Sequence, residues 1–406
     1  MIYFYILAIL FIVIGLLYYL YLLFTPKKNK LNLETEIVKD PNIAILIPAR
    51  NESIVIEELL NSIEKQSVKV NPNNVFVIVE SEKDPTIEIV KRHQMNYFVR
   101  KKLKLKTKGY ALAEMIEDLN SKKQYFDLYF IFDADNVLDP DFIKYMLDDY
   151  HLGYAISTGF RALKNNDNYF SVSAGLTFLM INEIRNRNAL KQNGNLILSG
   201  TGYYIHGRLI RKWQTFPFHS LTEDYESSLY YALNGVSTHY QDKAIFYDEQ
   251  PNNYKKSIIQ RSRWIKGYLK NWLKYRLKLK AKAKDKNAIN RKSLIELYIG
   301  ITPALDIVFG LILLIILVLI TTGISFSYKV FIYFLLFLGI IYLSLILLTA
   351  ILLYNLVKQT KLSKKIILQV LLYHPIFLIS YLHAFVIALG KRNLGWEVIT
   401  HDYKNN

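Results

Sequence analysis

Two acidic side chains stand one residue apart at the end of an apolar run. In DLYFIFDADNVLDP, positions 127–140, Asp133 and Asp135 follow the stretch that ends at Phe132. Such a pair is costly unless a cation or proton offsets the repulsion. Residues two apart in a strand face the same side, so both carboxylates could reach one ion. Their hard oxygen ligands favour Mg²⁺ or Mn²⁺, which would neutralise a departing diphosphate. The alternative is a helix-capping pair.

A second acidic group lies at the start of a predicted helix. LTEDYESSLYYALNG places Glu223 and Asp224 at the head of this helix, where the helix dipole stabilises a carboxylate. Asp224 is a candidate general base for an acceptor hydroxyl. A plain N-cap, without catalytic role, is the alternative.

A Gln-Arg-Trp set follows at helical spacing. Gln260, Arg263 and Trp264 lie in QRSRWIKG. Trp stacks on the apolar face of a sugar ring, and Gln and Arg hold hydroxyl or phosphate oxygens. Anchoring at a membrane interface is the competing interpretation for Trp264.

Two strand ends offer further polar groups. In IAILIPARNES the apolar run stops at Pro48 and is followed by Ala49, Arg50 and Glu52. Ligands bind at such strand ends in parallel sheets. NVFVIVESEKDPT repeats the pattern and ends at Glu80, which suits the donors of a ribose or base unless it is an ordinary loop carboxylate.

Two glycine-containing stretches suit close approach to a ligand. Lys108 and Gly109 precede a run of good helix formers, where backbone N–H groups and a lysine suit a phosphate, although surface lysines are common. Gly200, Thr201 and Gly202 form a flexible turn that lets the backbone approach a ligand.

The composition indicates a membrane protein. Hydrophobic residues make up 52% of the 406 residues, too many for an ordinary soluble protein. The chain has no cysteine, which excludes disulfides, thiolate metal sites and cysteine nucleophiles. The net charge of +17 lies beside apolar runs and forms no nucleic-acid module, so anionic lipid headgroups and a nucleotide diphosphate are the favoured counter-charges.

Hydropathy and periodicity divide the chain into five parts. Residues 1–26 predict a transmembrane helix; Lys27, Lys28 and Lys30 follow it and place the next domain in the cytoplasm. Residues 40–252 alternate β-type runs with helical segments, which predicts an α/β domain with a largely parallel sheet. Residues 253–298 predict amphipathic interfacial helices, or otherwise a solvated basic helix against the domain. Residues 299–390 predict further transmembrane helices, and 391–406 a tail.

The last apolar run, 366–389, contains Pro375. It predicts either one kinked crossing or a broken, re-entrant segment, so the side of the carboxyl terminus stays open.

The order of these motifs resembles the membrane-embedded, processive family 2 glycosyltransferases, which include cellulose, chitin, hyaluronan and poly-N-acetylglucosamine synthases. The resemblance covers about residues 43–270 and rests on Asp133-Ala-Asp135, Thr222-Glu223-Asp224 and Gln260-x-x-Arg263-Trp264, in this order after PARNE. It implies a multi-pass cell-membrane protein with a cytoplasmic GT-A domain that binds a UDP-sugar.

The resemblance also implies roles for single residues. Asp133 and Asp135 match the metal-binding pair and Asp224 the catalytic base. The donor site is expected to comprise Pro48, Ala49, Arg50, Glu52, Glu80, Lys108 and Asp133. The acceptor site is expected to comprise Gly200, Thr201, Gly202, Glu223, Gln260, Arg263 and Trp264. The family usually has Asp where this chain has Glu80, which weakens the uridine role there.

The expected reaction is an inverting, metal-dependent transfer from a UDP-sugar to a growing β-linked polysaccharide. Transfer of one sugar to a membrane lipid, such as diacylglycerol, ceramide or a polyprenyl phosphate, is the first alternative. A non-catalytic membrane scaffold or sensor is the second, and it would require the metal ligands or the base to be lost. The sequence does not identify the sugar, the linkage or any partner subunits.

Overall fold

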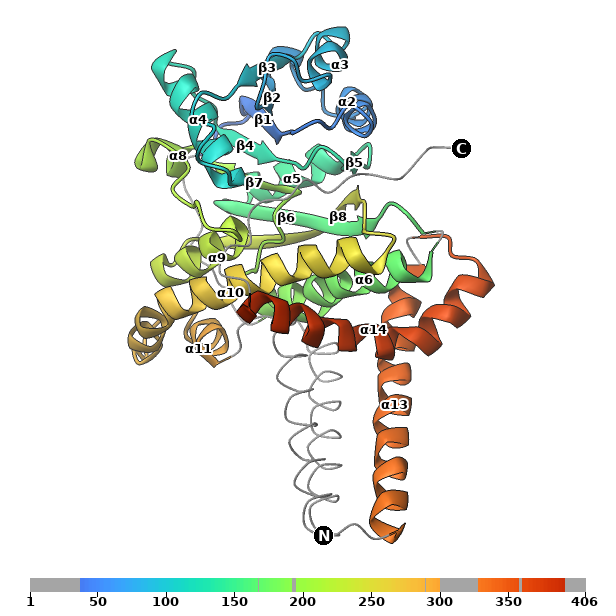
Figure 1. The fold of residues 1–406 in the computed structure, drawn as a ribbon. Coiled ribbons are helices and arrows are strands. Elements are labelled where there is room, and N and C mark those ends of the chain that lie inside the picture. Colours follow the sequence, from blue (N-terminus) through green and yellow to red (C-terminus); the bar gives the residue numbers. More distant parts are fainter. Residues whose placement is uncertain are drawn as a thin grey trace.

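The computed structural model describes residues 37–166, 168–191, 195–288, 290–299, 328–357 and 360–390. The predicted transmembrane helix at 1–26, the apolar run at 301–323 and the tail lie outside these residues. Figure 1 shows a sheet domain standing on a layer of helices, with one long helix leading away from that layer.

The centre of the domain is one mixed sheet of eight strands in the order β3-β2-β1-β4-β7-β6-β8-β5. The strands are β1 (Ile43–Pro48), β2 (Val75–Val79), β3 (Asn96–Val99), β4 (Leu128–Ile131), β5 (Val137–Leu138), β6 (Ile156–Leu163), β7 (Tyr203–His206) and β8 (Thr238–Asp248).

The sheet is mixed, so the prediction of a largely parallel sheet is confirmed only in part. β3, β2, β1 and β4 are parallel, whereas β7 runs antiparallel to both β4 and β6, and β5 runs antiparallel to β8. β7 follows the Gly-Thr-Gly turn, and its apolar pattern does not indicate whether it pairs parallel or antiparallel with its neighbours. β6 and β8 are also parallel to each other, so parallel pairs occur on both sides of β7.

Helices cover both faces of the sheet. The central strands read as unbroken apolar runs because both of their faces are buried. In β1, Ile45 and Ile47 pack with one face's core, while Ala44 and Leu46 pack with the other. The first face is covered by α2 (Ile56–Glu64), α3 (Thr86–Arg92) and α5 (Phe142–His151), and the second by α4 (Lys108–Ser121), α8 (Gly207–Trp213) and α9 (Glu223–Asn234).

The lower layer packs under β6 and β8. It consists of α6 (Tyr169–Leu179), η2 (Met180–Asn186), α7 (Arg187–Lys191), α10 (Tyr254–Ala283), α11 (Arg291–Ile299), α13 (Tyr328–Val357) and α14 (Lys364–Gly390); a short turn, η1 (Pro72–Asn74), precedes β2. The segment η2 continues α6 as a π-helix. Such wider turns often occur beside functional sites.

Of the helices among the described residues, α14 is the one long and apolar enough to cross a membrane by length and composition, with 44% of that window buried inside the protein. Its later part lies below α10 rather than alongside α13 (Figure 1). Phe377, Tyr381 and Ala384 of α14 pack there against Ile258 and Ile265 of α10. Part of the run is therefore held against the domain, and both predicted forms, a kinked crossing and a re-entrant segment, stay predictions.

Candidate active site

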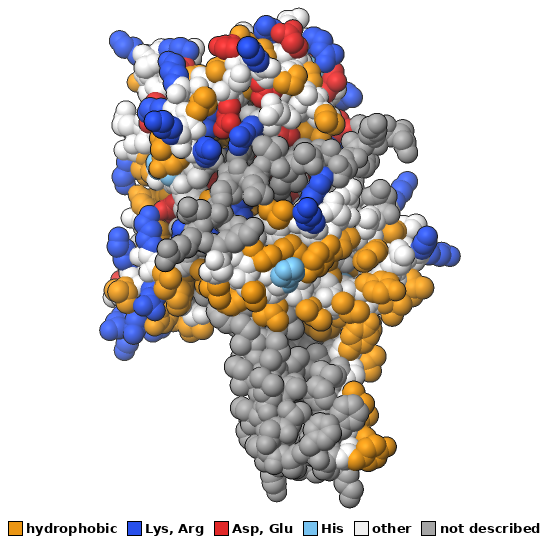
Figure 2. All heavy atoms as spheres, in the orientation of Figure 1, with side chains coloured by type: hydrophobic (Ala, Val, Ile, Leu, Met, Phe, Trp, Pro, Cys, Tyr) orange, Lys and Arg blue, Asp and Glu red, His pale blue; other side chains and the backbone are white. Residues whose placement is uncertain are grey.

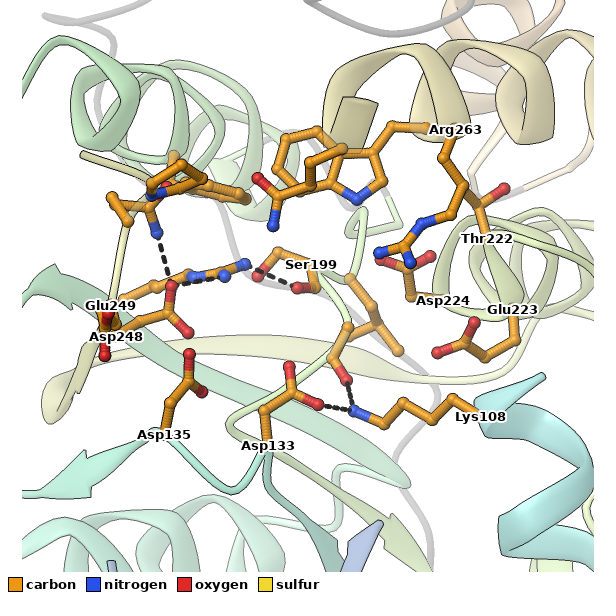
Figure 3. Close-up of a pocket in the computed structure, with 18 of the residues that line it drawn as sticks. Lys108, Asp133, Asp135, Ser199, Thr222, Glu223, Asp224, Asp248, Glu249 and Arg263 are labelled. Atoms are coloured by element: carbon orange, nitrogen blue, oxygen red, sulfur yellow. Dashed lines mark hydrogen bonds and ion pairs between the residues drawn. The ribbon is translucent and has the colours of Figure 1, made fainter. Parts of the chain in front are cut away.

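The site is a cavity of about 220 Å³ between the carboxyl ends of the strands and helix α10 (Figure 3). Most of the residues singled out in the sequence line it. These are Pro48, Arg50, Glu52, Lys108, Asp133, Asp135, Gly200, Glu223, Asp224, Gln260, Arg263 and Trp264.

Three carboxylates meet at one end of this cavity. Oxygens of Asp133, Asp135 and Asp248 lie within 4.8 Å of one another. Asp133 and Asp135 reach this cluster from a turn, because β4 ends at Ile131; the assumption that strand geometry persists to Asp135 was wrong. Asp248 ends β8 and was not predicted, although it follows an apolar run just as Asp133 does.

Two neighbouring side chains hold these carboxylates in place. The Asn136 amide donates to Asp135 Oδ1 at 3.2 Å and to Asp248 Oδ1 at 2.9 Å. The backbone N–H of Asp133 donates to Thr201 Oγ1 at 2.8 Å. Thr201 and Gly202 thus support the cluster from behind and do not line the cavity. A Cβ at Gly202, where φ is +67°, would lie 2.1 Å from the Phe246 ring, so glycine is required there.

Two cations offset part of the repulsion between the carboxylates. Lys108 Nζ pairs with Asp133 and donates to the Gly200 carbonyl at 2.7 Å. Arg161 pairs with Asp248 at 2.6 Å, with the face of its guanidinium 3.7 Å from the Phe178 ring centroid. Arg161 was not predicted, because an isolated arginine in a strand has no distinctive spacing.

The cluster fits a divalent cation. Its donors are all hard carboxylate oxygens from three separate chain positions, and their spacing lets one ion of the Mg²⁺ or Mn²⁺ type contact all three. Lys108 and Arg161 orient Asp133 and Asp248 without occupying every carboxylate oxygen. Asp133, Asp135 and Asp248 are therefore the residues that would hold the ion.

Glu223 and Asp224 form a buried acidic pair in the first turn of α9. Burial raises the pKa of Asp224 to about 6, partly opposed by the Tyr225 N–H that donates to Oδ1 at 2.8 Å. Burial, together with the adjacent Asp224 charge, raises the pKa of Glu223 to about 8. At neutral pH Glu223 therefore carries the proton and Asp224 is ionised, as a general base must be.

Helix α10 forms the opposite wall. Gln260, Arg263 and Trp264 face the cavity, and the Trp264 ring meets Phe178 edge-to-face with centroids 5.6 Å apart. Arg261, inside the same motif, points away: its side chain is buried between α10 and α14 and donates to Ser380 and Ser257. Helix α10 thus turns Gln260, Arg263 and Trp264 toward the cavity and Arg261 toward α14.

The next turns of α10 fix the start of α9. Asn271 Nδ2 donates to the Thr222 carbonyl and Oγ1, each at 3.1 Å. Gly267 lies so close that a Cβ would be 2.5 Å from Thr222 Oγ1. Gly267 and Asn271 are seven and eleven residues after Gln260, so they continue the same helical face. These two residues position Glu223 and Asp224 and were missed in the sequence.

Replacing Gly267 by Ala is expected to lower both the thermal midpoint and the turnover. The added methyl must displace Thr222, and overpacking of this kind costs about 1–3 kcal/mol. Removing the opposing methyl and hydroxyl in Thr222→Ala should restore most of the loss in the double variant. Melting curves and initial rates of the four proteins test this, and additive losses in the double variant would rule out the contact as the cause.

Glu80 lies outside the cavity lining. Both of its oxygens are paired, with Arg50 Nε at 2.9 Å and with Arg100 Nη1 at 3.3 Å. Arg100 is held in turn by Glu114 at 2.8 Å. Ala49 is likewise buried beside the strand, where its N–H donates to the Ile78 carbonyl. Glu80 is therefore connected to the site by its ion pair with Arg50, which lines the cavity.

A protein-family profile described as "Glycosyltransferase like family 2" matches residues 41–267, more than half of the chain. The chain belongs to this family. The prediction of a glycosyltransferase with a GT-A-like α/β fold is thereby confirmed at the level of family and fold.

Two curated relatives of this glycosyltransferase are similar over part of their length. The probable glycosyltransferase YdaM of Bacillus subtilis is 22% identical over 237 residues, which cover 56% of this chain and 55% of YdaM. The poly-β-1,6-N-acetyl-D-glucosamine synthase of Staphylococcus epidermidis is 22% identical over 260 residues, 63% of this chain and 61% of that protein. The matches thus span less than two thirds of either relative.

A solved structure is similar over nearly the whole chain. The mannosyltransferase PcManGT from Pyrobaculum calidifontis, in complex with GDP-Man and Mn²⁺, superimposes with a TM-score of 0.57. The match covers 94% of this glycosyltransferase and 95% of PcManGT at 15% identity. At 15% identity this similarity shows a shared fold.

Proposed function

We propose that this protein is an inverting, metal-dependent glycosyltransferase that transfers a sugar from a UDP-sugar to a growing β-linked polysaccharide at the cytoplasmic face of the cell membrane. The observation that carries the proposal is the meeting, in one cavity, of the acidic cluster, a buried general-base candidate and the Gln-Arg-Trp face of α10. A non-catalytic scaffold is disfavoured because neither the acidic cluster nor the base is missing.

The reaction forms one glycosidic bond and breaks one sugar–phosphate bond. Asp224 accepts the proton of the acceptor hydroxyl as its oxygen attacks the anomeric carbon, and the nucleoside diphosphate leaves from the opposite face. The neighbouring Glu223, protonated at neutral pH, adds no second negative charge beside the developing alkoxide. One displacement inverts the configuration, so an α-linked donor gives a β-linkage.

The other cavity residues bind and orient the substrates. Lys108, at the start of α4, supplies a positive charge beside the diphosphate. Trp264 offers a ring face to the acceptor sugar, and Gln260 and Arg263 donate to its hydroxyls or to the diphosphate. A bound Mg²⁺ or Mn²⁺ would stabilise the charge that collects on the leaving diphosphate.

The proposal that the nucleobase of the sugar donor is uracil rests on the family resemblance. The PcManGT structure contains GDP-Man, whereas the polysaccharide synthases that the motifs resemble use UDP-sugars. In this chain Arg50 and its partner Glu80 stand at the strand ends where a nucleoside binds in such sheets. Arg50, which lines the cavity and is oriented by Glu80, can donate to a carbonyl oxygen of uracil.

Transfer of one sugar to a membrane lipid is the second candidate. It is favoured by the position of the cavity, because Phe178 of α6 and Trp264 and Tyr268 of α10 line it from the lower layer of helices. An acceptor whose head enters from that layer would reach Asp224 without a long polymer channel. Membrane attachment itself is supported by the side chains exposed on α13, among them Leu343 and Leu347 at 65% and 58%.

The test is a donor and product assay on the purified full chain with Mn²⁺. Labelled UDP-glucose, UDP-N-acetylglucosamine and GDP-mannose are each supplied with a membrane extract, and nucleotide release and product size are measured. A ladder of products with UDP release supports polymer synthesis, and a single lipid-soluble product supports the second candidate. Release of GDP alone would contradict the UDP assignment, and no release from any donor would contradict the proposal.

A further inference from the structure

Helix α14 turns polar groups inward and apolar groups outward. Ser380 and Tyr381 are buried, whereas Ile376 and Ile379 are 52% and 53% exposed. Figure 2 shows apolar side chains gathered along the outer side of the lower layer, at the level where α14 lies in Figure 1. The contact of α14 with the domain therefore includes hydroxyl groups, and burial of a hydroxyl is unfavourable unless it finds a partner inside the protein.

One of these partners is Arg261 of α10. Its guanidinium donates to Ser380 Oγ and to Oγ of Ser257, one turn earlier on α10. The guanidinium carbon also lies 4.3 Å and 4.8 Å from the ring centroids of Phe377 and Tyr381. Arg261 is only 2% exposed, and no carboxylate among the described residues pairs with it. Aromatic faces and hydroxyls thus take the place of a counter-charge.

A buried charge without a counter-ion is not needed to pack two helices. Apolar residues of similar volume do this as well or better, because they carry no desolvation cost. A guanidinium adds direction, since its planar fork of donors fits one rotation and one axial position of the partner helix. Arg261 follows Gln260 and precedes Arg263 and Trp264 on α10. A rotation of α10 at this point would turn these three side chains away from the cavity that they line.

The next residue of α14 is bonded to α6, which carries a second wall of the cavity. The hydroxyls of Tyr381 and Thr177 are hydrogen-bonded at 2.8 Å, and both residues are buried. Phe178, directly after Thr177, lines the cavity. Its ring meets the Trp264 ring edge-to-face and lies under the Arg161 guanidinium. Two consecutive residues of α14 are therefore hydrogen-bonded beside the aromatic side chains on which an acceptor sugar would rest.

We propose that Ser380 and Tyr381 are positioning residues for glycosyl transfer, acting through Arg261 and Thr177 on the cavity walls that receive the acceptor. The inference rests on the proposed function, because it takes Trp264 as the acceptor platform. The acidic cluster is held by other elements, namely α4, β6 and the turn after β4. Loosening the contact with α14 should therefore disturb the acceptor side of the cavity and leave the binding of Mn²⁺ and UDP intact.

Arg261→Met in the full chain is the principal test. Methionine fills similar space between the Phe377 and Tyr381 rings but makes no directed bond to Ser380, so the thermal midpoint should change little. Transfer should fall by up to about a hundredfold, the loss that a misplacement of about 1 Å causes. Labelled UDP-glucose and UDP-N-acetylglucosamine are supplied with Mn²⁺ and a membrane extract, and released UDP is compared with label in the product. Water then replaces the acceptor hydroxyl more often, so the share of UDP that is released together with free sugar should rise.

Smaller substitutions supply the matched comparisons. Ser380→Ala should shift transfer and hydrolysis in the same direction, and it should add nothing to Arg261→Met in the double variant, because the pair is then already broken. Tyr381→Phe removes only the hydroxyl that meets α6 and should act in the same direction. Ser262→Ala is the control: this buried hydroxyl of α10 donates at 2.9 Å to a carbonyl of its own helix, and its loss should leave transfer unchanged.

The outcomes separate this inference from the proposal on which it rests. Normal transfer in Arg261→Met overturns the positioning role, and so does a parallel loss of thermal midpoint, UDP binding and transfer. Additive losses in the double variant would show that Ser380 does not act through Arg261. If Arg261→Met does not accumulate, Ser380→Ala and Tyr381→Phe decide, and normal transfer in both overturns the inference. All these results leave the proposed function standing, whereas a wild-type chain that releases no nucleotide would overturn both.

Discussion

Asp224→Asn is expected to lower glycosyl transfer by about a hundredfold to ten-thousandfold, the usual contribution of a positioned general base. The amide has nearly the same shape as the carboxylate and still accepts the Tyr225 N–H bond that fixes Oδ1. It cannot, however, take the proton of the acceptor hydroxyl. Nucleotide binding should persist because Asp224 is not among the clustered carboxylates. Transfer rates, with a parallel titration of Mn²⁺ and UDP, measure the two effects separately.

Glu223→Gln is the matched comparison. Glu223 stands beside Asp224 and is buried, and its raised pKa, about 8, means that it already carries a proton at neutral pH. Glutamine imitates that neutral form, so transfer should fall by no more than about tenfold. If Glu223→Gln proved as damaging as Asp224→Asn, or if Asp224→Asn turned over normally, the assignment of the base would be wrong.

The pH dependence of transfer gives an independent check on the same pair. Burial raises the pKa of Asp224 from 3.8 to about 6, so the group takes up a proton as the pH falls through about 6 and the base is lost. Transfer should therefore decline on the acid side near pH 6, not near pH 4. Glu223→Gln removes the second titrating carboxyl of the pair. The transfer rate of this variant should still decline as the pH falls, through protonation of Asp224 alone. A rate that is flat from pH 7 to 5 would contradict the burial argument.

The sequence indicated the residues of the site better than their arrangement. Asp133 follows a strand end, Asp224 lies at a helix start, and Trp264 belongs to a short motif at helical spacing; all three are local features of the chain. Asp248, Arg161 and Asn271 contribute through contacts with residues far away in the sequence, such as the Arg161–Asp248 pair at 2.6 Å. Spacing along the chain contains no trace of such contacts. Only the apolar run before Asp248 offered a local indication.

The direction of the strands was hidden for a related reason. An apolar run predicts a buried strand but not the neighbour with which it pairs. β7 pairs antiparallel with both β4 and β6, and in the turn before it, Gly200–Gly202, Thr201 Oγ1 accepts from the Asp133 N–H. The same glycines were predicted to approach the acceptor, and their main observed effect is on the acidic cluster. Glu80 is the opposite case. It was predicted to bind the donor, but its carboxylate pairs with Arg50 and Arg100.

Asp248→Asn is expected to weaken Mn²⁺ binding by at least about tenfold, the lower end of what an outer-shell change costs in a metal site. The buried Asp248 carboxylate is tied to Arg161 and Asn136, so it cannot move away to leave a cluster of two. Its replacement removes one of three negative charges and frees Arg161 next to the two that remain. Binding of Mn²⁺ in the presence of UDP, followed by the loss of the free-ion resonance signal, measures the change, and Asp133→Asn should show at least as large an effect.

Asp149→Asn is the control for the loss of a buried carboxylate as such. Asp149 is also fully buried and accepts from Ser157, His239 and Gln241, but on α5, outside the cavity. It should lower the thermal midpoint and leave Mn²⁺ affinity unchanged. Should Asp248→Asn behave like Asp149→Asn, with lower stability but normal metal affinity, Asp248 would be only the partner of Arg161. The ion would then be held by Asp133 and Asp135 alone, and the three-carboxylate site would have to be abandoned.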